Sequence, residues 1–180
     1  MIIASQKKKE NIAEYLLYMW QIEDLIRAYR LDIDALQANV IDACDISAEK
    51  KKEMREWYES LIEMMRSEDV VEKGHLQLNK NVIIDLTDLH LSLLKSPRQP
   101  FYGASFFKTL PYIVELRNRS GEAQAGEIET CFNALYGVLL LRLQQKEISE
   151  GTQAAIKQIT SFLALLSAKY REEKAGDLEL

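Results

Sequence analysis

The chain has 180 residues, of which 47% are apolar and 28% are charged, and its net charge is −5. This length is typical of one domain and allows a sizeable core without disulfides or a structural metal. Seven glycines and three prolines are too few for a disordered or all-β chain, so the composition favours an α-helical protein.

In the first part of the chain, apolar residues return at every third or fourth position, which is typical of amphipathic helices. A short helix is predicted from about Ile33 to Cys44, and a longer one from an N-cap at Ser47 to about Arg66. The helix that precedes them carries one apolar stripe: Ile12, Leu16, Met19, Ile22 and Ile26.

The fourth predicted helix has a leucine and valine stripe and ends near Ser96, because Pro97 disfavours α geometry in the residue before it. Residues 97–100 form a proline-rich linker. In the segment that follows, Pro111 allows two interpretations. It lies either in the first turn of a helix that runs to about Arg119, or inside a longer helix that it kinks.

The last two predicted helices begin near Gln124 and at residue 150, after a stop at Ser120-Gly121 and a cap at Ser149. The final helix is expected over residues 150–173. Together the elements predict an all-α fold, an antiparallel helical bundle of about seven helices, four or five of them long. No internal repeat or composition break divides the chain, so residues 1–180 are predicted to form a single helical domain.

The cysteines and the first residues favour a cytoplasmic location. Cys44 and Cys131 form no CxxC pair, so neither a zinc site nor a disulfide framework is indicated and a reducing compartment fits. Met1–Ala4 are followed by polar and basic residues, so we expect no secretory signal. The aliphatic runs are too short to span a bilayer, and we expect no membrane association.

Titratable side chains form no complete catalytic or metal-binding motif. Glu72 and His75 match half of the carboxylate–histidine motif that helical bundles use for paired metals, and the other half is missing. His90 would lie roughly 22 Å from His75 along one helix, so the two histidines cannot share an ion. We interpret both as surface or core side chains, interpret Asp85 and Asp88 as a solvated face, and predict no cofactor.

Arg142 lies within the most apolar run of the chain, Val138–Leu143. A buried guanidinium needs a partner, so we expect a structural ion pair, or a side chain that reaches solvent at the core edge. The candidate partners are acids on other helices: Glu14, Asp24 and Glu115. The alternative is a ligand site for a carboxylate or phosphate, in a cavity lined by aromatic side chains: Trp20, Tyr102 and Phe106.

Two surface features bear on binding partners. The basic triplets Lys7–Lys9 and Lys50–Lys52 are each followed by glutamate, and the acidity around them argues against nucleic-acid binding. The last helix has a second face of small side chains, which admits either a helix of the same chain or the partner in a two-fold homodimer. This predicted interface consists of Ala154, Ser161, Ala164 and Ala168.

These patterns favour a helical protein-interaction or scaffold module that self-associates, with an unknown protein partner. The alternative is a small-molecule-binding or metal-dependent helical-bundle enzyme, motivated by Arg142 and by the half motif at His75. Glycine-rich phosphate loops, His-Glu-x-x-His and CxxC pairs are all missing from the sequence, which lowers the expectation of an enzyme.

Two stretches resemble a known family: Lys7–Asp24 (KKKENIAEYLLYMWQIED) and Leu110–Arg117 (LPYIVELR). They are similar to small all-helical proteins of about this length from Bacteroides and its relatives, which are classed as a domain of unknown function. The resemblance covers nearly the whole chain. It implies a single-domain, cytoplasmic, helical protein, and it brings no catalytic residue, cofactor or partner.

Overall fold

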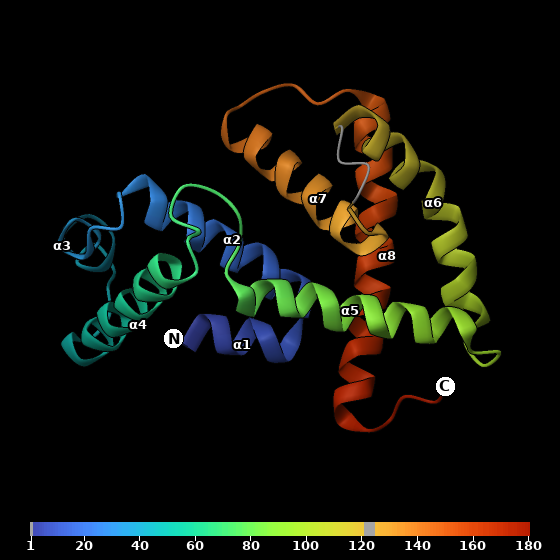
Figure 1. Ribbon diagram of the computed structural model, residues 1–180, viewed down its shortest axis with the longest axis horizontal. Helices are drawn as coiled ribbons and strands as arrows, with labels where there is room; N and C mark the ends of the chain where they lie inside the picture. Colours follow the sequence, from blue (N-terminus) through green and yellow to red (C-terminus); the bar gives the residue numbers. More distant parts are fainter. Residues whose placement is uncertain (1, 121–124) are drawn as a thin grey trace. The chain divides into compact units, whose positions relative to one another are not determined.

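A computed structural model describes residues 2–120 and 125–180, and these residues form eight α-helices and one π-helical segment, with no strand among them (Figure 1). The all-α fold class is therefore confirmed. The elements are α1 Ile2–Glu10, α2 Ile12–Ala28, α3 Ile33–Leu36, η1 Gln37–Ile41, α4 Ala48–Ser67, α5 Gln77–Lys95, α6 Pro100–Ser120, α7 Glu127–Leu143 and α8 Glu150–Ala175.

The sequence pattern located both ends of α4 and α8 and the C-terminal ends of α5 and α6, whereas the helix predicted from Ile33 to Cys44 is α3 followed by η1, which ends at Ile41. Both serine caps are confirmed, since Ser47 Oγ accepts from the Lys50 N–H and Ser149 Oγ accepts from the Thr152 N–H, each at 3.3 Å. The α1 helix was not predicted, because its sequence is mostly polar and has no apolar stripe. The expected stop at Gly121 and helix start at Gln124 lie outside the described residues.

Pro111 lies inside α6, so the second interpretation of this proline is correct. Its ring nitrogen has no hydrogen to donate to the carbonyl of Phe107, one turn earlier, and such a gap bends a helix. Figure 1 shows α6 as a curved helix.

The chain divides into two compact units, unit 1 (Met1–Glu10 and Glu14–Asn81) and unit 2 (Asn11–Ala13 and Val82–Leu180). The boundary falls inside the continuous α5 helix and does not coincide with the predicted linker at residues 97–100, which lies within unit 2 and ends on Pro100, the first residue of α6.

Each unit has its own apolar core. In unit 1, the buried faces of α2 and α4 supply much of it: Leu16, Met19, Ile26, Tyr58, Leu61 and Met65. In unit 2, helices α6, α7 and α8 contact one another pairwise. They bury Tyr102, Ile113, Phe132, Ile159 and Phe162. No helix within the described residues is long and apolar enough to cross a membrane.

The single domain predicted from the sequence can be tested because both tryptophans, Trp20 and Trp57, lie in unit 1. Their fluorescence reports on unit 1 alone, whereas far-ultraviolet circular dichroism reports on every helix. Since α5 crosses the boundary without a break, we expect the two signals to follow one coincident urea transition. Two separate midpoints would show that the units unfold independently and would contradict a single domain.

Candidate functional site

A buried carboxylate holds unit 1 together. Glu23 of α2 is fully buried, and its oxygens accept hydrogen bonds from three donors in residues 75–79, which span the start of α5. His75 Nδ1 lies 2.6 Å from Oε2, while the Leu76 N–H and Asn79 Nδ2 donate to Oε1 at 2.9 and 2.7 Å. A buried carboxylate is costly unless its oxygens are satisfied, and these donors satisfy both.

Arg27, one turn after Glu23 in α2, binds the preceding part of the same segment. Its Nη2 donates to the carbonyl oxygens of Val70, at 3.0 Å, and of Gly74, while Nη1 pairs with Asp24 at 2.9 Å. Gly74 has a φ of +87°, a conformation that favours glycine. Glu23 and Arg27 together fix residues 70–79 against α2.

Trp20 covers the imidazole of this network. Its ring stacks on His75 with the centroids 4.1 Å apart and the planes 12° from parallel. Burial, and then the negative charge of Glu23, raise the pKa of the nearby Tyr15, so its phenol stays protonated. Trp20 therefore belongs to the Glu23 network in unit 1, whereas the other residues of the predicted ligand site lie in unit 2.

Glu72 and His75, the half motif noted in the sequence, do not form a joint metal-binding site. Glu72 is exposed, and His75 Nδ1 is engaged by Glu23. Within residues 2–120 and 125–180, no three His, Cys, Asp or Glu side chains are grouped so that they could hold a metal ion. Glu23 was not predicted as a site residue, although it lies four residues after Met19 and three before Ile26 and so falls on the apolar stripe of α2.

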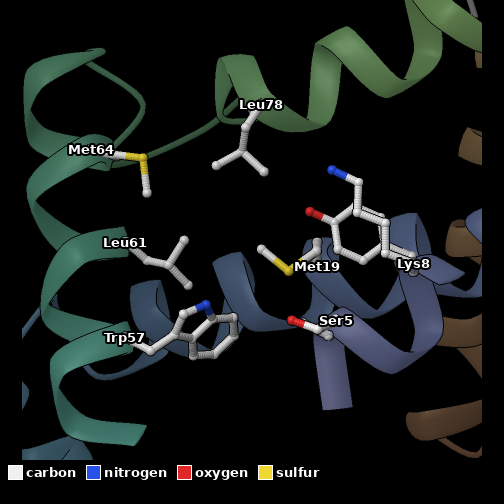
Figure 2. A pocket seen from close by; sticks show the side chains of 9 residues that line it. Ser5, Lys8, Met19, Trp57, Leu61, Met64 and Leu78 are labelled. Atoms are coloured by element: carbon white, nitrogen blue, oxygen red, sulfur yellow. The ribbon is translucent and has the colours of Figure 1, made fainter. Parts of the chain in front are cut away.

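Unit 1 also contains an open cavity of about 270 Å³ (Figure 2). Trp57, Leu61 and Met64 reach into it from α4, opposite Met19 of α2, and Leu78 of α5 closes another side. The polar lining residues Ser5 and Lys8 come from α1, and Tyr15 from α2.

In unit 2, His90 is a core histidine surrounded by aromatic rings. Its Nδ1 lies 2.7 Å from the hydroxyl of Tyr102, and the rings of Phe106 and Phe162 pack edge-on against it. Burial raises the pKa of Tyr102, so its phenol stays protonated. Burial also lowers the pKa of His90, which favours the neutral imidazole. Tyr102 and Phe106 are therefore core side chains.

The two cysteines are free, and Cys131 is fully buried in unit 2. Burial raises the pKa of its thiol to about 12, so at neutral pH it is not the thiolate that nucleophilic chemistry requires.

Of the two structural roles expected for Arg142, the structure fits a side chain that reaches solvent and not an ion pair. Its side chain is exposed in the last turn of α7, and the described residues offer it no carboxylate within ion-pair distance. The ion pair was expected because a guanidinium within the apolar run Val138–Leu143 needs a partner if that run is buried. Of these six residues only Val138 is buried, so the run leaves room for an exposed guanidinium.

Apolar surface is exposed on each of the three helices that pack together in unit 2. In α7, Leu143 is 68% exposed and four further leucines are partly exposed: Leu135, Leu139, Leu140 and Leu141. In α6, Phe107 is 66% and Val114 47% exposed, one on each side of the exposed Pro111. In α8, the small-residue face is open, with three members exposed and one partly exposed: Ala154, Ser161, Ala164 and, partly, Ala168.

The fold and these sites define an all-helical protein with a polar network and an open cavity in unit 1 and an exposed apolar surface in unit 2. The chain belongs to the family described as Domain of unknown function (DUF4924), whose model matches residues 1–177. No curated protein and no solved structure was found to match the chain.

Replacing the buried carboxylate tests its role in unit 1. Glu23→Gln keeps the shape of the side chain but replaces one acceptor oxygen by an amide NH2 group, which would face the donors of the network. We therefore expect the free energy of unfolding to fall by about 3 kcal/mol. Glu63→Gln, an exposed site on α4, should change it by less than about 0.5 kcal/mol. Urea unfolding followed by tryptophan fluorescence measures both. Equal, small effects would show that the network contributes little.

The lowered pKa of His90 predicts a loss of stability in acid. Below about pH 6.5 the unfolded chain binds a proton at this site that the folded chain binds only at lower pH, so stability falls as the pH falls. His90→Phe removes the imidazole that binds this proton. Between pH 6.5 and 5 the stability of wild type should therefore fall more steeply than that of the variant, by at most about 1.4 kcal/mol per pH unit. Parallel curves from urea unfolding at each pH would contradict the assignment.

Proposed function

We propose that the protein is a cytoplasmic helical protein-interaction module that self-associates through unit 2. The observation that supports this most is the composition of α7. From Ala134 to Leu143 the helix carries one charged side chain, Arg142, and yet much of its apolar surface is open to solvent. A helix that is apolar on all sides is normally buried, so this surface is suited to another protein chain.

The α4 helix of the same chain shows what a solvent-facing helix looks like in this protein, and it differs from α7. Its outward positions are densely charged, and Lys52 and Arg55 form ion pairs with glutamates one turn further on. This chain therefore places charged residues on a helix that faces water. The second half of α7 departs from that pattern, which is why its exposure favours a binding surface over an ordinary solvated face.

The exposed residues of α6 and α8 support the same proposal. Phe107, Pro111 and Val114 follow one another at helical spacing, so they lie along one side of α6. The small side chains on α8 would allow a second helix to approach closely. A symmetric dimer would use each of these faces twice, and a stable interface buries roughly 800 Å² on each partner.

The alternative of a metal-dependent or ligand-binding enzyme built around Arg142 has less support. Arg142 is exposed, and the aromatic residues expected beside it are core side chains of unit 2 or part of the Glu23 network in unit 1. We therefore favour the interaction module.

Sedimentation equilibrium over a wide concentration range tests self-association. We expect wild type to dimerise, and Leu143→Glu to raise the dissociation constant at least about tenfold, because it would bury a charge at the interface. Leu143 is 68% exposed, so the folded chain should tolerate the change. Ile3→Glu, at a 47% exposed apolar residue of unit 1, is the matched control and should leave the constant unchanged.

A wild-type chain that stays monomeric at every concentration would contradict self-association. An equal effect of Leu143→Glu and Ile3→Glu would place the interface elsewhere. Circular dichroism of both variants establishes that neither has lost its helices.

A further inference from the structure

We propose that the cavity in unit 1 binds a small amphipathic carboxylate, with the apolar chain between α2 and α4 and the carboxylate at Lys8. This inference concerns a different unit from the self-association surface and does not depend on it. The cavity is open and has a volume of about 270 Å³, below the roughly 300–1,000 Å³ of sites for drug-sized ligands. It therefore suits a short apolar chain or a single ring.

The walls of the cavity are apolar and adaptable. Met19 and Met64 face it from α2 and α4, and Trp57 adds a flat aromatic surface (Figure 2). Methionine side chains are unbranched and can adjust to ligands of different shape. Leu61 and Leu78 complete a lining that would contact hydrocarbon and would offer nothing to a fully polar ligand.

The polar groups that line the cavity are one cation and hydrogen-bond donors, with no carboxylate among them. The nine lining residues include one cation, Lys8, and no carboxylate. The Lys8 ammonium lies 5.4 Å from the centre of the Tyr15 ring, which places it at the cavity rather than away from it. The Ser5 hydroxyl and the protonated phenol of Tyr15 add two hydrogen-bond donors to the lining.

Lys8 also has charge to offer a ligand. Its neighbour Lys7 pairs with Glu14 at 3.1 Å, whereas Lys8 has no carboxylate within ion-pair distance among the described residues. A ligand carboxylate would supply that partner through a charge-assisted hydrogen bond. A cationic ligand would meet Lys8 without any acid to balance its charge.

Octanoate is the probe, because it joins one carboxylate to a short alkyl chain. Binding can be followed by calorimetry and by the fluorescence of the tryptophans, one of which, Trp57, lines the cavity. We expect octanoate to bind wild type with a Kd of about 0.1–1 mM. Lys8→Met keeps the aliphatic stem and removes the charge, and it should weaken octanoate about fivefold while leaving octan-1-ol unchanged.

Two further variants make the result specific. Lys9→Met removes a charge one residue further on, at an exposed side chain that does not line the cavity, and should leave octanoate binding at the wild-type level. Ser5→Trp fills the cavity from an exposed position and should abolish binding of both octanoate and octan-1-ol.

Three results would overturn the proposal. The first is the lack of octanoate binding to folded wild type. The second is an equal loss in Lys8→Met and Lys9→Met, which would indicate general surface charge. The third is wild type binding octan-1-ol as tightly as octanoate, which would remove the role of the carboxylate.

Discussion

The hydrogen-bonded burial of the Glu23 carboxylate is the interaction on which unit 1 depends. Its three donors lie 52 to 56 residues further along the chain, so one side chain of α2 fixes the start of α5. Leu78 lies between two of those donors, Leu76 and Asn79, and it closes one side of the cavity. The position of this cavity wall therefore follows from where Glu23 holds the chain.

The core of unit 2 contains a neutral polar pair among aromatic rings in place of a buried carboxylate. Its core centres on a neutral histidine, His90, which is hydrogen-bonded to a protonated tyrosine and enclosed by phenylalanine rings. The helices around that core also leave apolar side chains exposed or partly exposed, most clearly in the second half of α7. A polar network that orders one unit and an unburied apolar surface on the other suggest separate tasks, small-ligand binding in unit 1 and association in unit 2.

The sequence predicted the features that depend on neighbouring residues. The serine caps at Ser47 and Ser149 and the end of α5 before Pro97 follow from local hydrogen bonding and sterics, so a single sequence is enough to find them. The choice between the two interpretations of Pro111 needed the structure, because proline is tolerated in a first turn and also inside a kinked helix.

The candidate sites depend on residues far apart in the chain, which sequence spacing alone cannot bring together. Glu23 lies on the apolar stripe of α2, but its donors are more than 50 residues away and could not be paired with it from sequence spacing. For Arg142, the sequence left open whether the guanidinium pairs with an acid or reaches solvent. A continuous apolar run was expected to be buried, whereas the chain covers only part of it. Periodicity shows which residues can be buried, and it does not show how much of that surface a single chain covers.

The hydrogen exchange of the Leu76 backbone amide, measured by NMR, tests the role of Glu23 most directly. Leu76 directly precedes α5, where amides have no partner within the helix and normally exchange quickly. Because this N–H donates to the buried Glu23 carboxylate, we expect it to be protected as strongly as amides in the middle of α5. Exchange as fast as that of residues 71–74 would contradict the account.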